Sequence, residues 1–322
     1  MLVATIPYPR IDPDVLRLGS LHVRWYGIAY LLGFVLALAA LRLMSRKGIL
    51  RLPAEAAGGL VSWLAMGVVL GGRLGWWMFY HRAQGAVEPW YEPLAIWHGG
   101  MSFHGGLAGV LVALLAWSWR QRAPFWNLAD CLALVAPLGL FFGRIANFIN
   151  AELVGRPTAL PWGIVFPGDN VARHPSQLYE AILEGPLLLA LLWLFRRRCR
   201  VPEGRTAAMF LILYGILRFA VEFTRQPDPQ LGFIAFGWLS MGQLLSAVLV
   251  ATGLVVWVSR RGQPASGSAG RVAPAVAHSP CSKEFAHDGQ DHRILAGGGG
   301  VGGPNGMQQP QGRRGFHAHE TR

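Results

Sequence analysis

Charged and polar side chains close an apolar run that is long enough to cross a bilayer. The run ends in residues 143–155. The polar residues of this segment are Arg144, Asn147, Asn150 and Glu152. A charged side chain near the centre of a bilayer costs about 2.5–3.5 kcal/mol on insertion scales. A helix that only had to cross the membrane would carry apolar residues here, so the segment indicates a functional site inside or at the rim of a membrane protein.

Two further arginines, Arg73 and Arg218, also lie inside apolar segments. Together with Arg144 they come from three different segments, and we expect them to converge on one pocket. Guanidinium groups present paired donors to phosphate oxygens, and the abundant phosphates of a bilayer belong to lipid headgroups. The three arginines therefore predict a phospholipid-binding pocket.

Acidic side chains offer the alternative, in which the arginines form structural ion pairs. Glu222 follows Arg218 by four residues, and Glu180 and Glu184 have the same spacing, so each pair shares one helix face. No acidic residue lies close to Arg73 in the sequence. We therefore expect the partner of Arg73 to come from another span or from a ligand.

Candidates for proton transfer lie near the ends of the apolar segments. His104 stands among four glycines, and imidazole exchanges protons near neutral pH, although a packed core histidine is the alternative. Tyr26 opens the first apolar segment, where an interfacial anchor is the alternative. Tyr214 shares a helix face with the arginine and glutamate of its segment. His98 and His104 have no cysteine or carboxylate at a useful spacing, so we expect no metal site.

The composition is typical of a membrane protein. Of the 322 residues, 52% are hydrophobic and 14% are charged, whereas soluble globular proteins have about 25% charged residues. A net charge of +12 would suggest a nucleic-acid partner in a soluble protein. In a membrane protein it reflects basic cytoplasmic loops and attraction to anionic lipids, so we expect no nucleic-acid partner.

The elements that must position these side chains are transmembrane helices, each of about 20 apolar residues. We predict an all-α polytopic membrane protein with seven spans. The spans are residues 23–43, 59–80, 99–119, 127–150, 178–195, 207–223 and 237–258. The second and third are rich in glycine, which suits close packing of helices in lipid.

Lysine and arginine concentrate in alternate loops, which predicts an outside N-terminus and a cytoplasmic C-terminus. Residues 1–262 are then one transmembrane catalytic domain, in which residues 151–177 form a small extracytoplasmic cap. Residues 263–322 are rich in Gly, Pro, Ala and Gln and lack hydrophobic periodicity. We predict a disordered cytoplasmic tail there.

Four blocks in chain order resemble the bacterial prolipoprotein diacylglyceryl transferase family, over about residues 8–260. The family signature is similar to Gly-Arg-x-x-Asn-Phe-x-Asn-x-Glu-x-x-Gly at 143–155. The other blocks are Gly-Gly-Met-Ser-Phe-His-Gly-Gly-Leu at 99–107, His-Pro-x-Gln-Leu-Tyr-Glu at 174–180 and Tyr-Gly-x-x-Arg-Phe-x-x-Glu at 214–222. The chain departs from the family at Arg24, where histidine is frequent.

The resemblance implies a multi-pass enzyme of the bacterial inner (cytoplasmic) membrane that acts in lipoprotein maturation. It would transfer the diacylglyceryl group of phosphatidylglycerol to the thiol of the lipobox cysteine of a preprolipoprotein. The products would be a thioether and glycerol 1-phosphate. Phosphatidylglycerol and the preprolipoprotein signal peptide are the implied partners, and no metal or organic cofactor is implied.

The residue roles follow from the resemblance together with the chemistry of the site. Arg144 and Arg218 would bind the headgroup phosphate, and Asn147 and Glu152 would bind the glycerol hydroxyls or orient the arginines. The thiolate is the reactive form of a thiol with a pKa near 8.5, and His104 would take its proton. Tyr26 and Tyr214 would be supporting donors. The expected phosphatidylglycerol site also includes Arg73, Gly155 and Glu222.

Two other classes of function remain open at this point. The intramembrane arginines alone would suit a transporter or channel for an anionic, phosphate-containing solute, which needs a water-filled path and paired broken helices. They would also suit a lipid-binding scaffold without catalytic activity.

Overall fold

The computed structural model describes residues 6–9, 11–12, 14–18, 21–78, 91–95, 100–199, 201–227 and 232–261. The chain divides into two compact units, residues 1–272 and 273–322, and every described residue belongs to the first. The tail predicted at residues 263–322 therefore lies outside the described residues.

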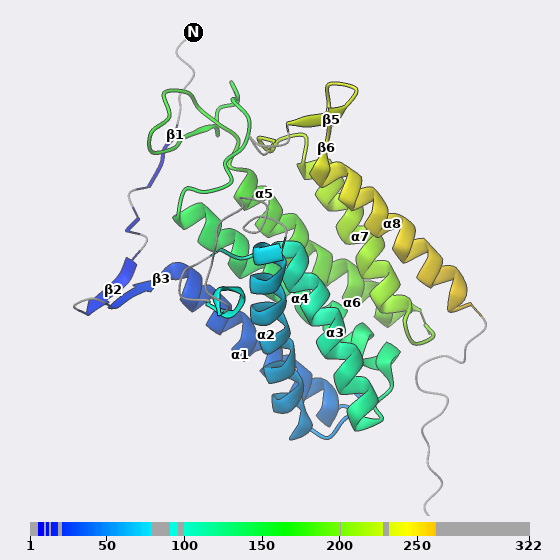
Figure 1. Cartoon of the computed structure of the whole chain (residues 1–322). Helices are drawn as coiled ribbons and strands as arrows, with labels where there is room; N and C mark the ends of the chain where they lie inside the picture. The colour runs from blue at the N-terminus through cyan, green and yellow to red at the C-terminus, as the bar shows by residue number, and fades with distance from the viewer. Residues whose placement is uncertain are drawn as a thin grey trace, which may run out of the picture. The chain divides into compact units, whose positions relative to one another are not determined.

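The fold is a bundle of helices that run alongside one another (Figure 1). The α-helices are α1 Trp25–Arg46, α2 Ala56–Trp76, α3 Phe103–Gln121, α4 Phe125–Ile149, α5 Ser176–Ile182, α6 Leu188–Arg198, α7 Arg205–Val221 and α8 Met241–Ser259. A π-helical turn, η5 Leu183–Leu187, joins α5 to α6, and η3 Glu92–Leu94 is a short 3-10 helix. Each of the seven predicted spans overlaps one of these helical segments.

The bundle is accompanied by short strands, which the all-α prediction did not include. They are β1 Ile6–Pro7, β2 Asp14–Leu18, β3 Leu21–Arg24, β4 Ile164–Val165, β5 Phe233–Ala235 and β6 Leu239–Ser240. Within the described residues they form three two-stranded sheets, with β1 parallel to β4, and β2–β3 and β5–β6 antiparallel. These strands are only two to five residues long, so most are too short to show the alternation of apolar and polar residues by which a strand is predicted.

Five helical segments among the described residues are long and apolar enough to cross a membrane. They are Trp25–Arg46, Ala56–Trp76, Phe125–Ile149, Ser176–Arg198 and Met241–Ser259. Large apolar side chains also cover the outside of the bundle: Leu31, Val112 and Val255 are 64%, 65% and 68% exposed. Exposed apolar surface on this scale fits contact with lipid, and the chain is a multi-pass membrane protein.

Helices α2 and α3 pack backbone against backbone through glycines, as the sequence predicted. A Cβ added to Gly75 would lie 2.7 Å from the Cα of Gly105, and one added to Gly67 would lie 2.9 Å from the Cβ of Ala113. Side chains larger than glycine are excluded at these contacts, so the two helices interlock closely.

Helix α4 is the central element of the bundle, because it packs against α1 on one side and against α5, α6 and α7 on others. Its buried Asp130 accepts hydrogen bonds from the backbone N–H groups of Gly204, at 2.9 Å, and Ala207, at 2.8 Å. These are donors at the start of α7 that have no partner within that helix. The carboxylate thus caps α7 and fixes it to α4.

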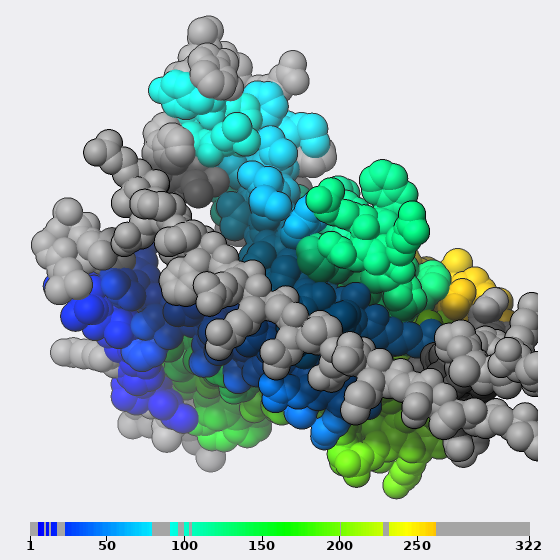
Figure 2. Space-filling model, turned by 90° about the horizontal axis from the view of Figure 1, so that it is seen from below, coloured from blue at the N-terminus to red at the C-terminus, as the bar shows by residue number. Residues whose placement is uncertain are grey.

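The loop turns at the lower end of the bundle carry many basic residues, and Figure 2 looks onto this end. The α1–α2, α3–α4 and α6–α7 connections all lie there (Figure 1). Basic residues at these turns are Arg46, Lys47, Arg51, Arg120, Arg122, Arg196, Arg197 and Arg198. The basic residues on which the orientation prediction was based therefore lie at one end of the bundle.

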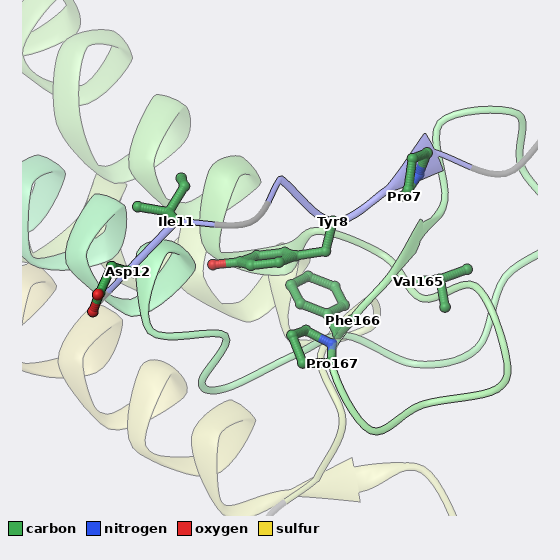
Figure 3. A pocket seen from close by; sticks show the side chains of 7 residues that line it. All are labelled: Pro7, Tyr8, Ile11, Asp12, Val165, Phe166 and Pro167. Carbon is green, nitrogen blue, oxygen red and sulfur yellow. The ribbon is translucent and has the colours of Figure 1, made fainter. Parts of the chain in front are cut away.

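Residues 151–175 connect α4 to α5 without a helix and cover the other end of the bundle; they correspond to the predicted cap. The backbone N–H groups of Ile6 and Tyr8 donate to the carbonyls of Gly163 and Val165, which holds the N-terminal segment against the cap. Figure 3 shows Tyr8 beside Phe166, in an open groove of about 630 Å³ that both segments line. The cap is thereby tied to the start of the chain.

Candidate functional site

The turn that follows α4 is backbone-strained and carries Glu152 at its centre. Ala151 and Leu153, on either side of Glu152, have φ values of 54° and 56°. This left-handed region costs a residue other than glycine of the order of 1–3 kcal/mol, and such strain concentrates at functional sites. Contacts elsewhere in the protein must therefore hold the turn.

Three side chains from other parts of the chain hold this turn. The hydroxyl of Tyr8 donates to the carbonyls of Phe148 and Ile149, each at 2.7 Å. Ser176 Oγ donates to the carbonyl of Leu153 at 3.1 Å, and Gln177 Nε2 donates to that of Glu152. The end of α4 and the strained turn are thus fixed from the N-terminal segment and from α5.

The side chain of Glu152 is bound to Tyr26. The Tyr26 hydroxyl donates to Glu152 Oε2 at 2.7 Å, and Asn147 Nδ2 donates to the same hydroxyl. Tyr26 is the second residue of α1, and the extended N-cap Arg24 lets the chain enter that helix beside the end of α4. The sequence left open whether Glu152 binds substrate or Arg144; its observed partner is Tyr26.

Arg144, one turn before Asn147 on α4, binds two glutamates of the next helical segment. Its Nε lies 2.8 Å from Glu180 Oε2 and 3.4 Å from Glu184 Oε2. The two glutamate side chains are 1% and 0% exposed, whereas that of Arg144 is 17% exposed. The glutamates are thus more deeply buried than the arginine.

Arg218 on α7 faces the same two glutamates. Its Nη1 lies 2.6 Å from Glu222 Oε2 and 3.9 Å from Glu180 Oε1, and its Nε lies 3.9 Å from Glu184 Oε1. Arg225 adds a third guanidinium, 3.7 Å from Glu180 Oε1. Glu222 also accepts a hydrogen bond of 2.9 Å from Ser240 Oγ at the N-cap of α8.

Three arginines and three glutamates therefore balance in charge around α4, α5, η5 and α7. The sequence correctly suggested that Glu180 and Glu184 could bind the arginines. For Arg144 the alternative of a structural ion pair is confirmed, because both glutamates come from the neighbouring helical segment. Tyr214, also on α7, is buried in the apolar cluster one turn before Arg218.

A π-helical turn at η5 carries Glu184. Pro186 has no backbone N–H to donate, and Gly185 departs from helical geometry with φ −95° and ψ −107°. The widened turn brings Gly185 against Phe141 of α4, where an added Cβ would lie 2.8 Å from the Cβ of Phe141. Such turns occur mainly at functional sites, and this one presents Glu184 to both arginines.

Arg73 belongs to a different ion pair. Its Nη2 lies 2.8 Å from Glu92 Oε1 and 2.9 Å from the Glu92 carbonyl, and its guanidinium stacks on Trp76 at 4.7 Å. The prediction of a partner from another span or a ligand is wrong, because Glu92 belongs to η3 in the loop after α2. The expected convergence of three arginines reduces to Arg144 and Arg218, joined by Arg225.

Gly155 marks a crossing of two backbones. It forms an antiparallel bridge with Arg225, and its N–H donates to the carbonyl of His174 at 3.0 Å. An added Cβ would lie 2.6 Å from the Cβ of His174 and 2.7 Å from the carbonyl oxygen of Thr224. Only glycine fits here, so the residue has a structural role whatever it binds.

His104 is the second residue of α3, and its side chain is outside the described residues. His174 lies in the cap, where its Nδ1 is 3.3 Å from the hydroxyl of Tyr179. Burial lowers the pKa of His174 below its ordinary value. Among the described residues, no three His, Cys, Asp or Glu side chains gather as metal ligands would.

Sequence reasoning missed Tyr8, Ser176 and Gln177 as residues of this site. Ser176 and Gln177 lie in the family-like block at 174–180, but only Glu180 of that block was considered as a partner of the arginines. Tyr8 gave no signal, because its partners lie 140 residues away in the chain.

The chain is similar to known proteins over nearly all of its described length. The family model for prolipoprotein diacylglyceryl transferase matches residues 13–259. A phosphatidylglycerol–prolipoprotein diacylglyceryl transferase of Nitratidesulfovibrio vulgaris is 49% identical over 267 residues, which are 83% of this chain and 100% of the relative.

Enzymes of the same name from two other bacteria have comparable identity. The relative from Ectopseudomonas mendocina is 47% identical over 272 residues, which cover 82% of this chain and all of the relative. The relative from Rhodospirillum rubrum is 45% identical over 277 residues, which cover 84% of this chain and all of the relative.

Proposed function

The chain belongs to the prolipoprotein diacylglyceryl transferase family, and from this premise we propose how its residues move the diacylglyceryl group of phosphatidylglycerol onto a prolipoprotein. It is a transferase, and its relatives' names state both substrates. The family favours this activity over transport of an anionic solute.

The acceptor atom is the sulfur of the lipobox cysteine. A carbon–sulfur bond forms between that sulfur and the carbon of the diacylglycerol that carries the phosphate, while the bond from this carbon to the phosphate oxygen breaks. The bonding pair leaves with glycerol 1-phosphate, and the thiol proton passes to a base of the enzyme. Negative charge therefore develops on the phosphate during the step.

The arrangement of Arg144 and Arg218 around shared glutamates is the observation that carries the proposal. Arg144 contacts Glu180 and Glu184 through Nε, and among the described residues its Nη atoms donate no hydrogen bond. The glutamates thus orient the guanidinium and leave its terminal donors for the headgroup phosphate. Donors held in place before the reaction stabilise the charge that develops on the leaving group.

Tyr26, Asn147 and Glu152 form a connected set of hydrogen bonds, and we assign Asn147 and Glu152 to the glycerol hydroxyls of the headgroup, with Tyr26 as a supporting donor. In this proposal Glu152 fixes the Tyr26 hydroxyl, and Asn147 connects that pair to the helix of Arg144. His104 is the proposed base for the thiol proton. Tyr214 and Glu222 support Arg218, and Gly155 allows the cap to approach the site.

The proposed setting is the bacterial inner membrane, with seven spans, an outside N-terminus and a cytoplasmic C-terminus. The basic turns at the end of the bundle opposite the cap support this orientation, because basic loops stay in the cytoplasm. Residues 151–177 and the site then face the side to which a signal peptide is translocated.

The test uses membranes that contain the full chain, phosphatidylglycerol labelled in its headgroup glycerol, and a prolipoprotein peptide with one cysteine. We expect labelled glycerol phosphate to be released and the peptide mass to rise by one diacylglyceryl group. A peptide with serine in place of cysteine should give neither product. Absence of both products with the cysteine peptide would overturn the proposal.

A further inference from the structure

Gln177, the second residue of α5, is buried and uses only one end of its amide. The side chain is 1% exposed, and its Nε2 donates to the carbonyl of Glu152. Because a carbonyl can only accept, this contact determines which end of the amide faces the strained turn. Oε1 is directed elsewhere, and it accepts a hydrogen bond from none of the described residues.

A buried amide oxygen normally has a donor, so the state of Gln177 needs a physical reason. Its surroundings provide one. Glu180 follows Gln177 by three residues on the same face of α5 and binds Arg144 at 2.8 Å. Gln177 therefore lies between the turn of Glu152 and the arginines proposed for the phosphate.

A second amide oxygen at the same turn is in the same state. Asn150 is the C-cap of α4, and its Oδ1 is buried without a donor among the described residues. Guanidinium donors and unpaired amide oxygens thus occur in the same region of the protein. A ligand that combines a phosphate with hydroxyl groups has both complements, whereas a headgroup without any hydrogen-bond donor would leave the amide oxygens unpaired.

We propose that Oε1 of Gln177 accepts a hydrogen bond from a hydroxyl of the headgroup glycerol and thereby favours phosphatidylglycerol over phospholipids whose headgroup has no hydrogen-bond donor. The inference rests on the proposed function, whose site it deepens. A site built to bond a hydroxyl disfavours an analogue that lacks it, because the protein group is then left buried and unpaired.

The experiment compares phosphatidylglycerol with phosphatidylpropanol, which has the same phosphodiester and chains but no headgroup hydroxyl. For the wild type we expect kcat/KM to favour phosphatidylglycerol by about tenfold to hundredfold. In Gln177→Met, which keeps the length of the side chain without its amide, most of this preference should be lost. Gln177→Asn is a smaller change that also withdraws the oxygen, and the same loss is expected.

The control is Ser176→Ala, which removes the neighbouring hydrogen bond to the turn but no acceptor of the proposed contact. It should slow both lipids equally and keep their ratio. An unchanged ratio in Gln177→Met, or no preference in the wild type, would overturn the proposal and leave water as the partner of Oε1.

A binding measurement separates this inference from the proposed activity. The two lipids are titrated into detergent-solubilised protein, and the thermal unfolding midpoint is followed. A preference for phosphatidylglycerol that is lost in Gln177→Met would support the contact even if no transfer occurred. Equal binding of both lipids by the wild type would contradict it.

Discussion

The Nε of Arg144 lies 2.8 Å from Oε2 of Glu180, in an ion pair that connects α4 to α5. The side chain of Glu180 is 1% exposed and that of Arg144 is 17% exposed, so the glutamate is the more deeply buried partner. An arginine held by Nε keeps a fixed plane, and its two Nη groups can bind two oxygens of one phosphate. Glu180 therefore fixes the orientation of the Arg144 guanidinium.

Arg144→Lys tests this arrangement. A lysine keeps the charge but cannot be held at one nitrogen while it binds phosphate with two others. We expect kcat/KM for phosphatidylglycerol to fall at least about a hundredfold with little change in unfolding midpoint. Arg173→Lys makes the same substitution at an arginine of the cap that binds Asp169 through Nε and Nη2; it is the control and should retain activity. Near-normal turnover of Arg144→Lys would contradict binding of the phosphate by an oriented guanidinium.

Glu184→Gln tests the charge balance. Removing one buried carboxylate leaves an excess positive charge beside Arg144 and Arg218, and we expect a loss of stability of about 3 kcal/mol without lipid. An anionic headgroup should restore much of it. Thermal unfolding in detergent, with and without phosphatidylglycerol, measures the recovery, which should exceed that of the wild type.

Glu92→Gln makes the same change at the separate pair with Arg73 and serves as the control. If Arg73 lies outside the headgroup site, phosphatidylglycerol will not restore this variant beyond its effect on the wild type. A recovery equal to that of Glu184→Gln would instead return Arg73 to the phosphate site.

Tyr8→Phe tests whether the N-terminal segment positions the site. The ring contacts with Phe148 and Phe166 remain, and only the hydrogen bonds to the end of α4 are lost. We expect about 1 kcal/mol less stability and about a tenfold lower kcat, because the strained turn is less well held. Adding Ala151→Gly should recover part of the rate, since glycine adopts positive φ without strain.

Tyr179→Phe is the control for that experiment. It removes a tyrosine hydroxyl from the same region, where the hydroxyl accepts from Trp162 Nε1 at 2.8 Å, but it does not touch the turn of Glu152. Equal losses of kcat in Tyr8→Phe and Tyr179→Phe would show a general effect of hydroxyl removal and argue against positioning.

His104→Ala tests the proposed base. Activity should be lost near neutral pH, and it should return in part at higher pH, where more of the peptide thiol ionises without help. The measurement is the pH profile of kcat/KM for the cysteine peptide. Full activity of the variant at pH 7 would remove His104 from the mechanism.

His174 should make stability dependent on pH. Burial lowers its pKa in the folded state below the ordinary value of 6.5, so between these values the unfolded chain binds more protons. Stability is then fully present above about pH 6.5 and falls as the pH decreases toward the folded pKa. Unfolding midpoints at pH 7.5 and 5.5 should differ less in His174→Asn than in the wild type; an equal difference would contradict this role.

The helices were predictable because an apolar run of bilayer length is a strong signal. Residues 127–150 were expected as a span, and α4 covers Phe125–Ile149. The π turn in the fifth span was not predicted, because Pro186 is compatible with several ways of ending or bending a helix. Short strands in the loops also gave no periodic pattern.

The charged cluster was predictable only in part. The i, i+4 spacing of Glu180 and Glu184 indicated a common face, and both bind Arg144 and Arg218. The partner of Arg73 could not be predicted, because Glu92 lies in a short 3-10 turn of a loop and no spacing rule relates it to α2. Long-range contacts of this kind depend on how the chain returns to the bundle.

The glycine contact between α2 and α3 also limits how a lipid can reach the site. Where Gly75 meets Gly105, and Gly67 meets Ala113, the two backbones leave no width for an acyl chain. Separating them would break every one of these contacts together, so α2 and α3 behave as one wall of the enzyme. A phospholipid that enters sideways from the bilayer must pass between other helices than α2 and α3.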